Sequence, residues 1–206
     1  MQKRILRTLV HPLVHREVYE CLTLYRHDAP ELRPATGAAS GAQVREVERA
    51  ELVRLSGDPA LGISAKFLRT IDERNDHCFA AFFGDTVVSY VFFAPTSPTA
   101  IDRHLSFQFP DGWLYVYKAF TVPAWRGKGL LPHLMFEAMR CLNRRDFVTL
   151  VMSENHGSRR AFERCGFRPQ ERFPVWRILS RPLRVSIPAH SSFGIDARAS
   201  PLAAPV

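Results

Sequence analysis

The sequence predicts an α/β fold built on a sheet of mixed strand direction. Strand-like and helix-like segments alternate along residues 42–180 in the order strand, two helices, three strands, helix, strand, helix, strands. The clearest helix, residues 130–142, carries a broad apolar stripe with polar side chains opposite. The next strand, residues 147–152, is continuously apolar, which is typical of a strand covered on both faces.

Composition divides the chain into three parts. Residues 1–41 are expected to form an N-terminal extension and linker, in which VYECLTLY (18–25) has strand character and the segment from residue 29 is rich in Ala, Pro, Gly, Ser and Thr. Residues 42–180 form the predicted domain. Residues 181–206 are half Pro, Ala and Ser, which favours a disordered tail, although the apolar Leu183, Val185 and Ile187 allow it to dock.

Periodicity and turn residues place the elements inside the predicted domain. An amphipathic pattern indicates a helix over residues 63–74, and Gly84-Asp85 divides an apolar run into a hairpin. The expected elements in order are a strand at 44–49, a short helix at 50–56, the helix at 63–74, the hairpin at 78–93, a strand at 113–122, the helix at 130–142, the strand at 147–152, a helix at 157–165 ending at Gly166, and a last hairpin of 167–169 with 175–179.

One stretch, residues 95–112, has no clear secondary-structure pattern and is too long for a simple turn. It carries Leu105, Phe107 and Phe109, more apolar surface than a solvated loop needs. Two interpretations stay open: the stretch covers the edge of the sheet, or it forms a lid that selects a substrate.

The net charge indicates what kind of partner the protein binds, and the cysteines indicate the redox state of its compartment. The net charge of +8 and the pI near 9.8 favour an anionic partner. The four cysteines lie far apart and form no CxxC pair, which argues against a zinc site or a disulfide framework and predicts a reduced, cytoplasmic chain. Neither a membrane span nor a nucleic-acid-binding motif is found in the sequence.

The stretch VPAWRGKGLLPHLM, residues 122–135, has the properties of an anion-binding turn. The first N–H groups of a helix have no partner within the helix, and the helix dipole adds partial positive charge there. Gly127 and Gly129 would let the backbone approach an anion closely, and Arg126 and Lys128 add full charges. Pro132 costs little if it lies in the first helical turn, where its missing N–H would have no helical partner. The turn is therefore predicted to hold a diphosphate.

Two common diphosphate sites do not fit this turn. The GxxxxGK[ST] loop of nucleotide triphosphatases is absent. The dinucleotide fingerprint fails because Pro132 occupies the place of its third glycine and because Asp146 precedes the next strand instead of following it.

The turn instead resembles the acyl-CoA signature of the GNAT acyltransferase superfamily, R/Q-x-x-G-x-G/A. Arg126 and Gly129 match the signature, whereas Leu131 occupies its final small position. A second block, ENHGSRRAFERCGF (154–167), resembles the asparagine, serine, short helix and Gly-Phe ending of that family. The resemblance implies a mixed, mostly antiparallel central sheet with helices on both faces, in which the parallel strands 113–122 and 147–153 splay apart.

The resemblance also implies a binding site for acetyl-CoA, or another acyl-CoA, as co-substrate, with no metal. Backbone groups of residues 120–122 would bond the pantetheine arm, and the amides of residues 127–131 would bind the pyrophosphate. The residues assigned to coenzyme A in this way are Phe120, Thr121, Val122, Arg126, Gly127, Lys128, Gly129, Leu130, Leu131, Asn155, Ser158 and Phe162.

Acid and base groups are harder to assign. Many relatives carry tyrosine where this chain has Phe162, and an acidic residue in the strand where it has Tyr117 and Lys118. Each remaining candidate also has a structural interpretation. The candidates are Tyr117 (packing) and Glu154 (an ion pair with Arg159), followed by His156 (a helix cap) and Asp111 (a turn).

Three functions follow from these observations. The leading one is transfer of an acetyl or other short acyl group from acyl-CoA to an amine of a small molecule or protein. The second is a non-catalytic CoA-binding module of the same fold, and the third, nucleic-acid binding, has no supporting motif. A homodimer is compatible with the sequence.

Overall fold

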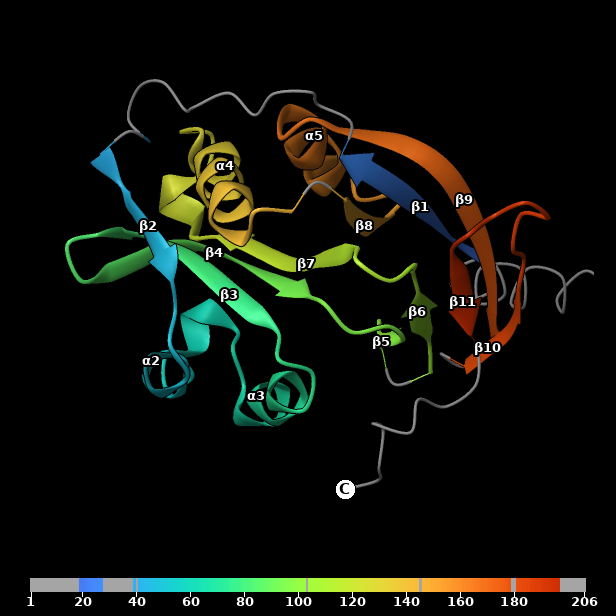
Figure 1. The fold of residues 1–206 in the computed structure, drawn as a ribbon, viewed down its shortest axis with the longest axis horizontal. Coiled ribbons are helices and arrows are strands. Elements are labelled where there is room, and N and C mark those ends of the chain that lie inside the picture. The colour runs from blue at the N-terminus through green and yellow to red at the C-terminus, as the bar shows by residue number, and fades with distance from the viewer. Residues whose placement is uncertain are drawn as a thin grey trace, which may run out of the picture.

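The computed structural model describes residues 19–27, 39, 41–102, 104–144, 146–178 and 181–196. The strands of these described residues form two sheets (Figure 1). The strands of the large sheet are β1 (Tyr19–His27), β2 (Gln43–Glu46), β3 (His77–Phe83), β4 (Thr86–Ala94), β7 (Leu114–Thr121), β8 (Phe147–Met152), β9 (Phe167–Ile178) and β10 (Arg181–Val185). The small sheet contains β5 (Thr99–Ala100), β6 (Ser106–Gln108) and β11 (Gly194–Asp196).

The large sheet has the strand order β10-β9-β1-β8-β7-β4-β3-β2. Its neighbouring strands are antiparallel, except that β7 and β8 run parallel. The sheet of mixed direction that the element order predicts is therefore confirmed, and so is the mostly antiparallel arrangement that the resemblance implies.

The parallel pair separates soon after it forms. β7 and β8 pair at Leu114↔Phe147 and Tyr115↔Val148, and both strands then continue beyond this pairing. On its other side β7 shifts register against β4 between Tyr90 and Phe92, and Lys118 takes a φ of 49°, in the left-handed region. The splayed strands expected from the resemblance are thus present, with a bulge beside the gap.

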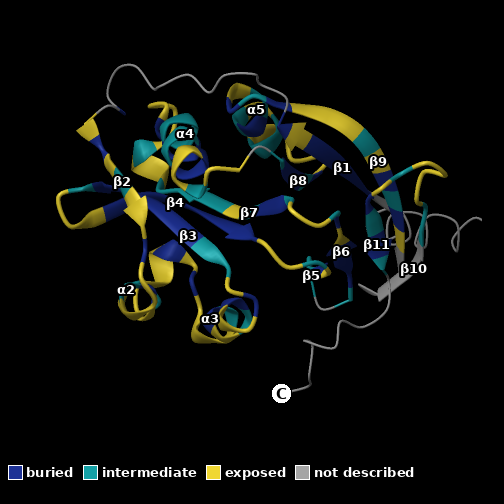
Figure 2. Cartoon of the chain, viewed as in Figure 1, coloured by how far each residue is buried: buried dark blue, intermediate teal, exposed yellow. Residues whose placement is uncertain are grey.

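Helices cover both faces of the sheet, as predicted. The helices are α2 (Arg49–Leu55), α3 (Ala65–Asp72), α4 (Leu130–Leu142) and α5 (His156–Arg164), with short 3₁₀ turns at Pro59–Leu61 and Pro123–Trp125. α4 and α5 lie on one face, and α2 and α3 lie on the other beside β2, β3 and β4 (Figure 1). Figure 2 shows the central strands buried between these layers.

The helix α4 begins and ends as its sequence predicts. Gly129 precedes it with a φ of 74°, and Asn143 follows it with a φ of 49°. Pro132 lies in the first turn, where no helical hydrogen bond is lost. The apolar stripe is buried against the sheet through Leu134, Met135, Ala138 and Met139, together with Leu130.

The segment assigned to an N-terminal extension contributes a central strand. β1 lies between β8 and β9 and pairs with both, and residues 21–25 are all buried. Leu22 and Leu24 face one core cluster and Tyr25 faces the other, so the strand is covered on both faces. The prediction of a strand at residues 18–25 is confirmed from Tyr19 onward. The prediction that this strand belongs to an extension outside the domain is wrong, because the strand lies inside the large sheet.

The C-terminal elements also differ from expectation. Residues 167–178 form one strand, β9, instead of a hairpin, because β1 pairs with it from Phe167 to Trp176. The expected disordered tail is ordered from Arg181 to Asp196, where β10 pairs with β9 and β11 pairs with β6. Residues 197–206 lie outside the described part of the chain.

The structure also decides between the two interpretations of residues 95–112. Their strands β5 and β6 join β11 in the small sheet, and Leu105, Phe107 and Phe109 are buried in a core cluster with Tyr115 and Phe173. These side chains therefore cover a face of the large sheet and do not form a wall for a substrate.

Within the described residues, no helix is long and apolar enough to cross a membrane.

Candidate functional site

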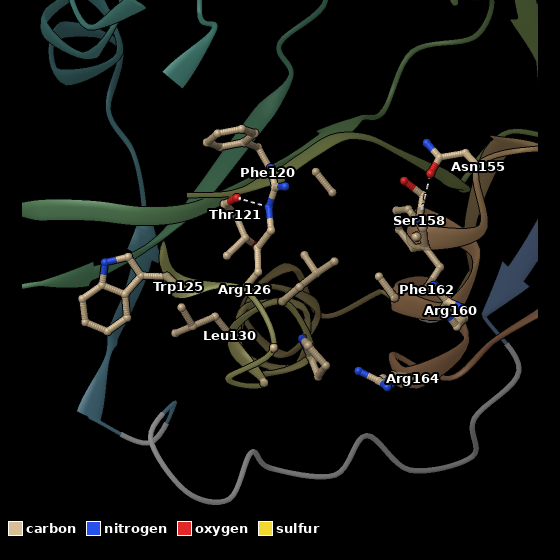
Figure 3. Close-up of a pocket in the computed structure, with 17 residues that line it drawn as sticks. Phe120, Thr121, Trp125, Arg126, Leu130, Asn155, Ser158, Arg160, Phe162 and Arg164 are labelled. Atoms are coloured by element: carbon tan, nitrogen blue, oxygen red, sulfur yellow. Dashed lines mark hydrogen bonds between the residues drawn. The ribbon is translucent and has the colours of Figure 1, made fainter. Parts of the chain in front are cut away.

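A cavity of about 630 Å³ opens beside the gap between β7 and β8, on the face covered by α4 and α5. One wall comes from β7 and the turn that follows it, and the other comes from α5 (Figure 3). Its lining residues are Ala119, Phe120, Thr121, Trp125, Arg126, Gly127, Gly129, Leu130, Leu131, Pro132, Asn155, Gly157, Ser158, Arg160, Ala161, Phe162 and Arg164.

The glycine turn, residues 126–131, supplies one end of this cavity. Gly127 and Gly129 have φ values of 76° and 74°, which favour glycine. A Cβ on Gly127 would meet no atom within 4 Å, and one on Gly129 would meet only the Cβ of Ala39 at 3.9 Å. The first backbone bond of α4 runs from His133 N–H to the Gly129 carbonyl, so residues 130 and 131 precede it. Both the open backbone and these N–H groups suit an anion.

The two cations of the turn are held differently. Arg126 Nε donates to the Thr121 carbonyl at 3.0 Å and remains in the cavity wall (Figure 3). Lys128 Nζ lies 4.5 Å from the ring centroid of Trp125, which stacks on Phe83. Lys128 is outside the set of lining residues, as is Val122.

The backbone of residues 120–122 already has partners. The Phe120 carbonyl accepts from Ser89 Oγ at 2.8 Å, and Val122 N–H donates to the Val88 carbonyl at 2.9 Å. A carbonyl oxygen can accept a second hydrogen bond, so Phe120 and Thr121 retain capacity for a ligand, whereas the N–H of Val122 is used by the sheet.

The α5 wall combines polar, apolar and basic groups. Asn155 Oδ1 accepts from Ser158 N–H at 3.0 Å and caps the helix, a role that the sequence analysis gave to His156. Phe162 is buried and packs edge-on against Phe167. Arg160 and Arg164 also line the cavity, and the sequence analysis missed them. Their spacing of four residues on a helix was the signal that could have found them.

The two catalytic candidates lie elsewhere. Glu154 is exposed just after β8 and outside the cavity lining. Arg159, its expected partner, donates to the Tyr25 hydroxyl at 2.9 Å and to the Ser153 carbonyl at 3.1 Å. Tyr117 lies on β7 and packs on the opposite face against Phe67 and Phe92.

Tyr117 is not suited to act as a general base. Burial, together with the nearby carboxylate of Asp76, raises the pKa of its hydroxyl far above the usual value. Asp111 is exposed at a turn, as its structural interpretation predicted.

The chemistry of the cavity fits coenzyme A. Its open glycine backbone and helix N-terminus suit a diphosphate, Arg160 and Arg164 suit a further phosphate, and Leu130 and Phe162 offer apolar contact. Among the residues that the structure describes, no group of His, Cys, Asp and Glu side chains is arranged to hold a metal ion.

Comparisons with known proteins point to one family. A model described as "Acetyltransferase (GNAT) family" matches residues 42–167. No curated protein matches the sequence.

Several solved structures share the fold at low sequence identity. A functionally unknown conserved protein from Staphylococcus epidermidis is 11% identical, with a TM-score of 0.55 over 94% of this chain and 67% of that one. A GNAT-family acetyltransferase from Colwellia psychrerythraea is 13% identical, with a TM-score of 0.52 over 82% and 60%. A GCN5-related N-acetyltransferase from Sphaerobacter thermophilus is 15% identical, with a TM-score of 0.51 over 82% and 56%. The chain thus spans 56% to 67% of the length of these structures.

Proposed function

Because the chain belongs to the GNAT acetyltransferase family, we propose that it transfers an acetyl or other short acyl group from acyl-CoA to an amine. The observation that carries this proposal is the cavity beside the splayed strands, with the glycine turn at one end and the basic helix α5 on its other wall.

The proposed binding mode assigns each part of coenzyme A to a wall of the cavity. The pyrophosphate binds the amides of residues 127–131, and a further phosphate binds Arg160 and Arg164. The pantetheine arm bonds the carbonyls of residues 120 and 121, while Ser158 and Phe162 contact its other side. Lys128 contributes long-range charge instead of a direct contact, because its ammonium group rests on Trp125.

The proposed reaction needs positioning more than acid or base groups. The nitrogen of a neutral amine attacks the thioester carbonyl, the C–S bond breaks, the thiolate leaves, and the proton released from nitrogen passes to water. The bulge takes residues 118 and 119 out of one-to-one pairing with β4, which makes their N–H groups candidates to stabilise the oxyanion. Glu154, which is exposed near the end of β8, is the proposed group that takes this proton from the water.

A non-catalytic CoA-binding module is the second candidate. It is favoured by Phe162, which has no proton to give, and by the high pKa of Tyr117. Release of free thiol from acetyl-CoA in the presence of a panel of amines separates the two candidates, because only the enzyme would accelerate it.

The acceptor proposed here is a small molecule or a protein, and the cytoplasm is the proposed compartment. The structure leaves all four cysteines as free thiols, which supports a reducing environment.

Gly129 offers a sharp test of coenzyme A binding. Gly129→Asp is expected to weaken CoA about tenfold or more, equivalent to roughly 1.4 kcal/mol, relative to Gly129→Asn. Aspartate and asparagine have nearly the same shape and both tolerate the left-handed backbone at this position, so the difference isolates the charge placed beside the diphosphate. Calorimetric titration with CoA measures the two dissociation constants.

Equal CoA affinities in the two folded variants would contradict the assignment of the glycine turn. Thermal unfolding of both variants provides the control, since the backbone strain that they share should lower their stability equally.

A further inference from the structure

Three polar side chains form a buried network behind β7, on the face away from the cavity: Arg74, Asp76 and Tyr117. The side chains of Arg74 and Asp76 are only 4% and 0% exposed. Arg74 follows α3 and Asp76 directly precedes β3, so the ion pair reaches β7 from a different part of the chain. Arg74 Nε lies 3.0 Å from Asp76 Oδ2, and Nη2 also bonds this oxygen.

The network determines what the Tyr117 hydroxyl can do. A phenol has one hydrogen to donate and two lone pairs that accept. The hydroxyl donates its hydrogen to Asp76 Oδ2 at 2.5 Å and accepts from Arg74 Nη2 at 2.9 Å. One lone pair therefore remains, and any further partner must be a hydrogen-bond donor.

Tyr117 also lies close in the chain to the β7 bulge and to the cavity lining. It directly precedes the bulge at Lys118, and Ala119, two residues further on, lines the cavity on the other face. The pairing of β7 with β8 ends at Tyr115, and Tyr117 is only partly buried on the face away from the cavity. An acceptor that contacts Tyr117 would therefore lie on the face opposite the cavity proposed for acyl-CoA.

A purely structural role accounts poorly for this pair. Burying two charges costs free energy that their attraction often fails to recover, and a buried ion pair is frequently no more stabilising than well-packed apolar residues. Phe67 and Phe92 already surround Tyr117 with apolar contacts. A role in orienting the hydroxyl gives the buried pair a function beyond stability.

We propose that the Arg74–Asp76 pair holds the Tyr117 hydroxyl as an acceptor-only group that takes a hydrogen bond from the N–H of the incoming amine. Tyr117 is then a residue that determines acceptor specificity, and Arg74 and Asp76 are positioning residues. This inference rests on the proposed acyl transfer to an amine.

The test compares Tyr117→Phe with a matched control, Tyr90→Phe. Tyr90 is also a buried tyrosine of the sheet, and its hydroxyl donates to the Leu61 carbonyl at 2.5 Å. The probes are acetyl-CoA with spermidine, tyramine or n-butylamine, and acetyl-CoA alone for hydrolysis by water. Tyr117→Phe is expected to raise the KM for the reactive probe amine about tenfold, as for loss of one well-oriented hydrogen bond, and to leave the KM for acetyl-CoA and the hydrolysis rate unchanged. Tyr90→Phe should change none of these constants.

A double-mutant cycle then tests whether Asp76 acts through Tyr117. Asp76→Asn should raise the KM for the amine in the wild-type background and have no further effect in the Tyr117→Phe background. If Asp76→Asn does not fold, the comparison of Tyr117→Phe with Tyr90→Phe still decides the role of Tyr117.

Two results would overturn the inference while acyl transfer itself stands: an unchanged KM for the amine in Tyr117→Phe, or a parallel rise in both KM values. Failure of the wild-type protein to acylate any probe while it binds CoA would instead overturn the proposed function, and the role of Tyr117 with it.

Discussion

A fragment that begins at residue 42 is expected not to fold into the native sheet, although it contains the whole region that the family model matches. Without β1, the facing edges of β8 and β9 lose their hydrogen-bonding partner. The two core clusters also lose the buried side chains of Leu22, Leu24 and Tyr25. Circular dichroism and denaturant titration of residues 42–196 should show no cooperative transition.

A pair of point variants in β1 provides a control in the full-length chain. Leu24→Asp places a carboxylate at a position that is 0% exposed and should lower the free energy of unfolding by several kcal/mol, roughly 3 or more. Arg26→Gln changes an exposed side chain of the same strand and should cost about 1 kcal/mol or less, because it removes a surface ion pair with Asp146. Cooperative unfolding of the fragment, or equal stability of the two variants, would contradict the role given to β1.

The second large effect is expected at Phe107. Phe107→Ala should lower the free energy of unfolding by about 3–5 kcal/mol, the range for removing a fully buried phenylalanine. The side chain is 0% exposed and contacts the rings of Phe109, Tyr115 and Phe193. Chemical denaturation monitored by fluorescence measures the change.

Val53→Ala is the matched control for Phe107→Ala. Val53 lies on α2 with 52% of its surface exposed, so its truncation should change the free energy of unfolding by about 0.5 kcal/mol or less. A small loss in Phe107→Ala, comparable with this control, would show that residues 95–112 are a loosely attached lid after all. CoA affinity of the folded variant should be unchanged, because the cavity lies on the other face of the sheet.

The buried position of residues 95–112 affects which residues should be mutated to find the acceptor site. Replacement of residues 97–109 by a short turn would remove part of a core cluster, so loss of activity would not identify a substrate-selecting loop. Residues near the β7 bulge, above all Tyr117, are better places to look for acceptor selection.

The sequence alone determined the local features of this protein. The start of α4 at the glycine turn, the buried stripe of the helix, the hairpin of β3 with β4 and the apolar strand β8 all follow from short-range patterns of turn residues and periodicity. The resemblance to the GNAT family rested on the glycine turn and the 154–167 block, and it led to the prediction of the splayed strands.

Only the tertiary structure decided which distant segments meet. Nothing local in residues 19–27 states that they pair with both β8 and β9, and the composition of residues 181–196 resembles that of a tail although β11 pairs with β6. In the sequence, Arg74 and Asp76 are ordinary charged residues after a predicted helix. In the structure they are buried against Tyr117, which lies more than forty residues later in the chain. The physical reason is that strand pairing and buried hydrogen bonds depend on partners supplied by other parts of the chain, and a period of two or 3.6 residues reports only which face of an element is apolar.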